Sequence, residues 1–290
     1  MIVRRGFYPW RIVRLSAPRF GLLLLYNSLI TVLVLVGGLS WLSLPDLPLP
    51  LLGSAVALVV TLRNNAAYAR WWEGRGLWGA VVNNSRSFAR SLALFLPDVA
   101  LRETLVRLQV AYVAALRCHL LRLEPWGVID GMVSAEVLAG LRDRANVPVA
   151  IQGEIVTRLA QAGLDSMALG GIDKALGGLA DAQGGLERIK NTPMPRRYNQ
   201  FPMLFAWAYC VLLPLGLVSS LGPATSIAAS VIGFMFLALD RMGVDLEDPF
   251  EGTVNDIPML ALARTIEIDL LQGIGVAAPG PVLPEDGVLW

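Results

Sequence analysis

Two long stretches of this 290-residue chain carry almost no charge, and they constrain its fold more than any other feature. Between Phe20 and Leu62 the only charged residue is Asp46, and between Tyr198 and Leu239 there is none. One helical crossing of a bilayer takes about 20 apolar residues, so each stretch can cross twice. The intervening segment has the composition of a soluble region. The sequence therefore predicts an all-α membrane protein with two hydrophobic hairpins and a large polar middle.

The overall composition supports this interpretation. Charged residues make up 16% of the chain and the mean hydropathy is +0.57, whereas soluble domains average about 25% charged residues. The formal net charge is +1. Because a strong basic field is absent, we expect no nucleic-acid partner.

Basic residues gather beside the predicted hairpins. Residues 1–19 contain five arginines and no acidic residue, and further Arg and Lys follow the first hairpin and precede the second. Lys and Arg near membrane ends stay on the cytoplasmic side, so we expect both termini and the middle region to be cytoplasmic. The apolar run continues past the length of a signal-peptide h-region, and no small-residue cleavage site stands out, so we expect the first helix to be retained.

The predicted organisation has five segments. They are a cytoplasmic N-terminal segment (1–19), a first transmembrane hairpin (20–62), a helical cytoplasmic region (63–197), a second transmembrane hairpin (198–240) and a cytoplasmic C-terminal segment (241–290).

The second predicted helix is unusual. The first helix is expected at Phe20–Leu42, and the second starts near Pro50 and meets no helix breaker before about Leu96. Its apolar part ends at Arg63 after about a dozen residues, or roughly 20 Å of helix. A short crossing that runs into Arg and Asn is tolerated beside protein or water, which favours a helix lining an aqueous path. Local thinning of the bilayer is the alternative.

Periodicity and helix breakers predict the remaining elements. Gly-Gly pairs recur every seven residues at 170–171, 177–178 and 184–185 without a preceding strand, so we expect close helix contacts there rather than a phosphate loop. The Pro- and Gly-rich tail, 277–290, is expected to be loosely ordered. Helices are expected at Leu101–Leu123, Ser134–Arg144, Ala150–Ala162, Phe201–Leu221, 224–239 (ending at Asp240-Arg241) and Asp256–Leu271.

Few residues offer catalytic or metal chemistry. The only His, His119, follows Cys118, and the other cysteine, Cys210, lies in an apolar run. Zinc sites need three or four ligands, so a helix-face pair is the better interpretation, and we expect no disulfide in a reducing cytoplasm. An enzyme needs a nucleophile with its base, a metal cluster or converging carboxylates. We therefore expect no enzyme, no metal and no cofactor.

Three groups of segments resemble the bacterial branch of the bestrophins, in the same order along the chain. They are Arg63–Arg75 with Leu77-Trp78-Gly79, then Asn191–Pro195, then Leu246–Phe250 with Asn255–Pro258 and Thr265–Glu267. Bestrophins are homopentameric ion channels. The resemblance implies a bestrophin-like, pentameric fold with four transmembrane helices per subunit, a large helical cytoplasmic region and cytoplasmic termini, in the cell inner membrane.

The resemblance also implies pore residues. In the family the second helix lines a narrow neck with three apolar rings one turn apart. Counting back from the Arg-Asn-Asn motif places these rings at Ser54, Leu58 and Leu62, which share one helix face. Ser54 departs from the family's bulky residue, and lipid-facing or interhelical positions are the alternative. Counting back from Pro195 places the family's cytoplasmic aperture at Met167.

A hydrophobic collar of this kind gates ions by dewetting, so the expected function is a gated ion channel. The resemblance implies monovalent cations such as sodium. A chloride or anion channel, as among animal relatives, is the alternative, and a non-conducting scaffold is a third possibility.

Animal bestrophins are gated by calcium through an acidic loop after the second hairpin. Here Thr253 and Val254 replace acidic positions of that loop. Calcium prefers several carboxylates, so we expect no tight calcium site, although Asp256 could supply one ligand. The same acidic residues would equally fit a helix-capping turn.

Overall fold

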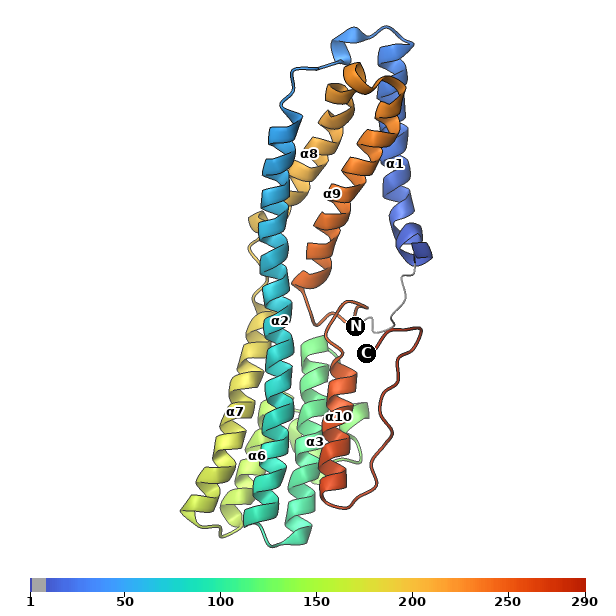
Figure 1. The fold of residues 1–290 in the computed structure, drawn as a ribbon. Helices are drawn as coiled ribbons and strands as arrows, with labels where there is room; N and C mark the ends of the chain where they lie inside the picture. Colours follow the sequence, from blue (N-terminus) through green and yellow to red (C-terminus); the bar gives the residue numbers. More distant parts are fainter. Residues whose placement is uncertain (2–8) are drawn as a thin grey trace. The chain divides into compact units, whose positions relative to one another are not determined.

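The computed structural model describes residue 1 and residues 9–290, with side chains described at Met1 and from Ala17 onward. The described residues are helical, apart from loops and one isolated β-bridge between Glu285 and Val288 (Figure 1). The helices are α1 (Pro9–Leu35), α2 (Leu49–Phe95), α3 (Val99–Leu121), α4 (Trp126–Ile129), α5 (Ala135–Leu141), α6 (Val147–Gln161), α7 (Ser166–Asn191), α8 (Arg196–Leu221), α9 (Thr225–Glu247) and α10 (Met259–Gly273), with short 3₁₀ turns η1 (Ser40–Leu42) and η2 (Gly222–Ala224).

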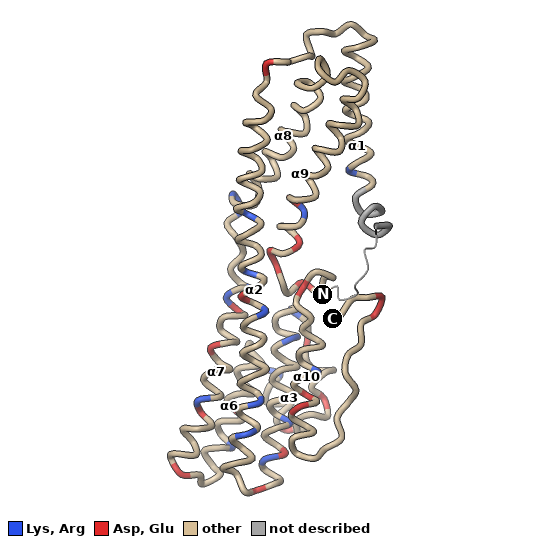
Figure 2. The backbone as a smooth tube through the Cα atoms, in the orientation of Figure 1, with Lys and Arg blue, Asp and Glu red and all other residues tan. Residues whose placement is uncertain are grey.

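The chain divides into two compact units. The hairpin unit comprises 5–70 and 193–247, and contains α1, the first part of α2, α8 and α9. The bundle unit comprises 1–4, 71–192 and 248–290, and contains the rest of α2, α3 to α7 and α10. In Figure 2 the helices of the hairpin unit have long stretches without a charged residue, whereas the charged residues of the bundle unit are spread along its helices.

In the hairpin unit, α9 packs against both α8 and α1. Polar side chains inside it bond to neighbouring helices: Asn27 Nδ2 donates to Ser230 Oγ at 2.9 Å. The start of α2 lies close to α8, because a Cβ at Gly53 would lie 2.6 Å from the Tyr209 hydroxyl. The apolar core is formed by Leu23, Leu49, Val56, Val60, Ala206, Tyr209, Cys210, Leu213, Ala229 and Leu237.

The bundle unit is built around α3. Its N-terminus is capped by Asp98, whose side chain accepts from the backbone N–H of Ala100 at 2.9 Å. Because α3 packs against α4, α6, α7 and α10, its apolar residues point into protein in several directions. Buried members include Leu105, Tyr112, Leu116 and Leu120.

Among the described residues, four helical segments are long and apolar enough to cross a membrane: Ala17–Leu35, Leu49–Phe95, Val99–Leu121 and Arg196–Glu247. The third is α3, and 72% of its most apolar window is buried inside the structure, against 17% for the first segment. A helix that is apolar all round is buried by protein or by lipid. Packing inside the bundle unit accounts for the composition of α3.

The glycine pairs confirm the expected helix contact. They all lie on α7, and the second glycine of each pair faces α2. A Cβ there would lie 3.2 Å from Phe95 at Gly171, 2.6 Å from Asn84 at Gly178 and 2.8 Å from Leu77 at Gly185. By contrast, a Cβ at the first glycine of each pair would meet nothing within 4 Å. The seven-residue repeat therefore leaves these positions of α7 without side chains, which allows residues of α2 to approach its backbone closely.

This difference predicts opposite effects at adjacent positions. Gly177→Ala should raise the free energy of unfolding by about 0.5–1 kcal/mol, because Ala is the better helix former and space is open. Gly178→Ala should lower it by about 1–3 kcal/mol, because the new methyl group meets the Asn84 amide. Thermal unfolding of the two purified variants compares them directly. A loss of stability at both positions would contradict the assignment of two distinct faces.

Several expected boundaries need correction. The long second helix is confirmed at Leu49–Phe95, but the first ends at Leu35 rather than at Leu42. There the chain passes Gly38 with a φ of +69°, which favours glycine and breaks the helix. The helix expected to end at Asp240 continues to Glu247. The Asp240 carboxylate does not end the helix and is paired with Arg63 inside the hairpin unit.

The C-terminal tail is not loosely ordered at its end. Val288 is only 3% exposed, and the backbone N–H of Ala261 donates to the carbonyl of Trp290 at 2.7 Å. Composition alone did not reveal these contacts with the start of α10. Of the N-terminal arginines, Arg4 and Arg5 lie outside the described residues.

Candidate pore-lining site

The three expected neck residues lie on α2 within the hairpin unit. Leu58 and Leu62 are 60% and 53% exposed, and Ser54 is exposed with its hydroxyl donating to the carbonyl of Leu51 at 2.8 Å. The opposite face of this helix carries the buried residues Val56, Val60 and Arg63. This apolar face of α2 is therefore left free to contact lipid, a second copy of the chain or a pore.

A buried ion pair begins directly after the last neck position. Arg63 is 1% exposed, and its Nη2 lies 2.6 Å from Asp240 Oδ1 on α9. The same nitrogen also donates to the carbonyl oxygen of Asp240. Charged side chains are rarely buried so fully unless they are paired. The pair therefore ties α2 to α9 at the end of the neck segment.

Neighbouring groups reinforce this attachment. Asn64 Nδ2 donates to the carbonyl of Leu239 at 2.8 Å, and the Tyr198 hydroxyl of α8 donates to the carbonyl of Leu62 at 3.3 Å. A Cβ at position 243 would lie 2.0 Å from Asn64 Oδ1, so only glycine fits there. We call the contacts made by Arg63 and Asn64 with α9 the α2–α9 clamp.

Sequence reasoning missed this clamp, although a signal was present. The first uncharged stretch ends at Arg63 and the second ends at Asp240, so two opposite charges close the two hairpins. Because antiparallel hairpins of similar length bring such ends to one level, the pairing was predictable in principle.

The expected aperture residue, Met167, lies at the start of α7 in the bundle unit. Its side chain is 83% exposed. The preceding Asp165 caps the helix by accepting from the backbone N–H of Ala168 at 2.8 Å. Met167 therefore projects from a fixed helix start and contributes little to the core of its own subunit.

The acidic turn before α10 is organised by its own backbone. Asp256 is 3% exposed and accepts from the backbone N–H of Glu251 at 2.6 Å and of Thr253 at 3.0 Å. The Thr253 hydroxyl donates to its other oxygen. Both carboxylate oxygens are thus engaged in a capping turn. In the described part of the chain, no group of three or more His, Cys, Asp or Glu could hold a metal ion.

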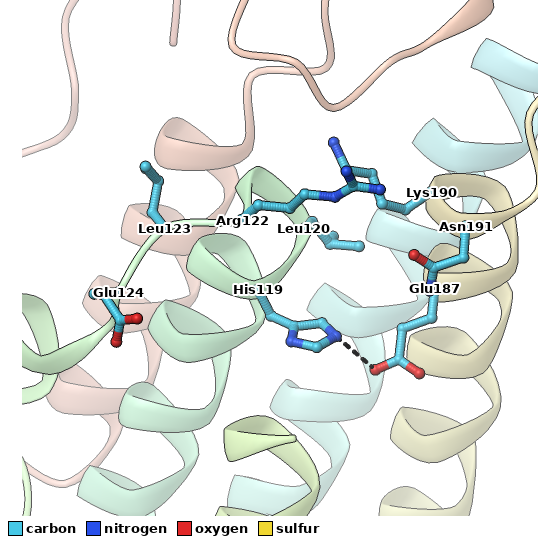
Figure 3. A pocket seen from close by; sticks show the side chains of 8 residues that line it. All are labelled: His119, Leu120, Arg122, Leu123, Glu124, Glu187, Lys190 and Asn191. Carbon is cyan, nitrogen blue, oxygen red and sulfur yellow. Dashed lines mark ion pairs between the residues drawn. The ribbon is translucent and has the colours of Figure 1, made fainter. Parts of the chain in front are cut away.

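A polar cavity of about 290 Å³ surrounds His119 in the bundle unit (Figure 3). His119 Nε2 lies 3.4 Å from Glu187 Oε1, which also accepts from Asn146 at 2.9 Å and Gln183 at 2.7 Å. Lys190 is held by Glu251 at 2.7 Å. The lining residues include no Ser, Thr or Cys, so the cavity presents no hydroxyl or thiol nucleophile with an activating base.

Cys118 precedes His119 but is buried in the helical core. Burial raises the pKa of the Cys118 thiol, and the nearby Arg117 only partly offsets this shift. Since the thiolate is the reactive form, we expect maleimide to label Cys118 far more slowly than a free cysteine at pH 7. Labelling should become fast in denaturant. Mass spectrometry of the native and the unfolded Cys210→Ser variant follows Cys118 alone; equal rates in both states would contradict its burial.

The chain is similar in sequence to a known protein family and to several curated proteins. Residues 12–272 match the family model described as bacterial/fungal bestrophin protein. A voltage-dependent anion channel-forming protein of Mesorhizobium japonicum is 34% identical over 235 residues, covering 80% of this chain and 76% of that protein. One of Salmonella typhimurium is 34% identical over 258 residues, covering 86% and 84%.

Solved structures of bestrophin homologues have a similar fold. A crystal structure of a bacterial bestrophin homologue from Klebsiella pneumoniae has a TM-score of 0.84 at 30% identity, covering 89% of this chain and 98% of that one. A point mutant of the same homologue has a TM-score of 0.86 at 28% identity, covering 90% and 99%. The family match and the curated relatives, which are named as channel-forming proteins, point to an ion channel and not to an enzyme. On the strength of the family match and these likenesses, the chain belongs to the bacterial/fungal bestrophin family.

Proposed function

We propose that the chain is the subunit of a homopentameric ion channel in which α2 lines the neck of the pore. The observation that carries the proposal is the exposed apolar face of α2. Leu58 and Leu62 stand on this face, one turn apart, and the buried charge of Arg63 follows at once. Five copies of the face around an axis would form a continuous apolar collar.

The proposed membrane topology uses the hairpin unit. In it, α1, the first part of α2, α8 and α9 are the four spans, in hairpins 20–62 and 198–240. The helical region 63–197 and the segments 1–19 and 241–290 lie in the cytoplasm, with both termini. The placement is supported by the concentration of Arg and Lys at the ends of the uncharged stretches, on one side. The membrane is the inner membrane of the cell.

The collar formed by Ser54, Leu58 and Leu62 is the proposed gate. Apolar rings offer no hydrogen bonds to an ion or its water, so a narrow ring dries and closes. Rotation of α2 that turns these side chains aside would wet the neck and open it. Ser54 makes the outermost ring the widest and most polar. Met167 forms a second, softer constriction at the cytoplasmic exit.

We propose that the permeant ion is an anion such as chloride. The curated relatives are named as anion channel-forming proteins, which favours this alternative over the monovalent cations implied by the first resemblance. A collar of uncharged side chains does not itself discriminate between anions and cations. Selectivity therefore comes from fixed charges near the entrances of the pore.

The reversal potential of the purified protein in a planar bilayer under a KCl gradient tests the proposal. A reversal potential near the equilibrium potential of chloride would support an anion channel. One near that of potassium would establish a cation channel instead. A correctly assembled protein that passes no current across voltage and pH would favour the scaffold alternative.

A further inference from the structure

A second cavity, of about 280 Å³, opens between α2 and α8 inside the hairpin unit. We call it the α2–α8 groove. It lies beside the collar and the clamp and shares one residue with each, Leu62 and Arg63. Its lining residues are Val59, Leu62, Arg63, Arg197, Tyr198, Phe201, Pro202 and Phe205.

The groove has a polar end and an apolar end. Tyr198 meets the carbonyl of Leu62, so Arg197 and Arg63 lie at the same level along the two helices. One and two turns further along α8 follow Phe201 and Phe205. Their rings stack with centroids 5.9 Å apart and remain 48% and 42% exposed. An aromatic wall thus extends away from a basic end.

The basic end of the groove is formed by arginines. Arg63 lines this end but is 1% exposed, and its Nε faces Gly243 of α9, where a Cβ would lie 2.7 Å from it. Asp240 neutralises the charge of Arg63, so the excess positive charge comes from Arg196 and Arg197. These two arginines also open α8, whose N-terminus is the positive end of the helix dipole. This end therefore favours an anionic group.

We propose that the α2–α8 groove binds an anionic phospholipid of the cytoplasmic leaflet. Its phosphate meets the basic end, and part of one acyl chain lies along Phe201 and Phe205. A free phosphate would leave the aromatic wall uncovered, whereas a lipid matches both ends. Basic pockets between membrane helices on the cytoplasmic side are suited to anionic headgroups. The inference rests on the membrane placement given under the proposed function.

Because of where the groove lies, a lipid bound in it would affect channel opening. Leu62 forms part of its wall and is also the innermost residue of the proposed collar. A chain seated against Leu62 restrains the rotation of α2 that would move this ring. The lipid composition of the inner leaflet would thereby adjust the opening of the channel.

Native mass spectrometry of the purified, delipidated protein tests binding without requiring any current. The probes are phosphatidylglycerol and phosphatidylcholine with identical acyl chains. We expect preferential retention of phosphatidylglycerol. Arg197→Gln should weaken its binding about fivefold, since one basic residue near an anionic membrane surface contributes about 1 kcal/mol. Arg241→Gln is the matched control, because Arg241 is an exposed basic residue at the end of the uncharged part of α9, outside the groove.

The following results would contradict the lipid site or separate it from the channel proposal. Equal retention of both lipids, or equal effects of the two substitutions, would overturn the proposal. Loss of the oligomer in Phe205→Ala, with lipid retention unchanged, would assign the groove to a subunit interface instead. If phosphatidylglycerol is retained by a protein that conducts no ion, the channel proposal fails while the lipid site stands.

Discussion

Replacing Asp240 with Ala is expected to lower the free energy of unfolding of the subunit by about 3–5 kcal/mol, the largest loss of any substitution considered. The substitution leaves Arg63 charged, 1% exposed and without its carboxylate partner at 2.6 Å. A buried, uncompensated charge is far more costly than a missing surface contact. Thermal unfolding in detergent, followed by tryptophan fluorescence, measures the loss.

Asp245→Ala provides the matched control. Asp245 pairs with Arg241 one turn further along α9, but those side chains are 29% and 54% exposed. A solvent-accessible ion pair contributes less than about 1 kcal/mol, so a much smaller loss than for Asp240→Ala is expected. Replacing both clamp residues, Arg63→Met with Asp240→Leu, should recover most of the lost stability because no buried charge remains. Equal losses for Asp240→Ala and Asp245→Ala would show that the Arg63–Asp240 pair contributes no more to stability than the Arg241–Asp245 pair.

Truncating the proposed collar should have the largest effect on function. The double variant Leu58→Ala and Leu62→Ala widens two successive rings and removes apolar surface, so water and ions enter more readily. We expect open probability to rise about tenfold, which corresponds to a shift of about 1.4 kcal/mol in the opening equilibrium. Single-channel recording in planar bilayers measures this directly. Subunit folding should be little affected, because both side chains are largely exposed within the subunit.

Leu94→Ala is the control for the collar. Leu94 lies on the same helix and is 73% exposed, but it belongs to the bundle unit. Its truncation should leave open probability unchanged. Unchanged currents in the Leu58 and Leu62 double variant would remove both residues from the gate.

The elements best predicted from sequence were those defined by long runs. The absence of a breaker between Pro50 and Leu96 predicted one long helix, and the structure has it at Leu49–Phe95. The glycine pairs predicted a close helix contact, because a repeat of seven returns to one helix face. Errors arose where the deciding contact is distant in sequence, as at the end of α9 and in the C-terminal tail.

The sequence alone determined the helical class, the two long uncharged stretches and the family, since all three follow from charge spacing, periodicity and local motifs. It also placed Ser54, Leu58 and Leu62 on one helix face by simple counting. Tertiary structure alone decided which faces are buried and which partners meet. It joined Arg63 to Asp240, 177 positions away, and showed that Asp256 caps a turn. The physical reason is that helix periodicity is local, whereas pairing of buried charges depends on how distant segments pack.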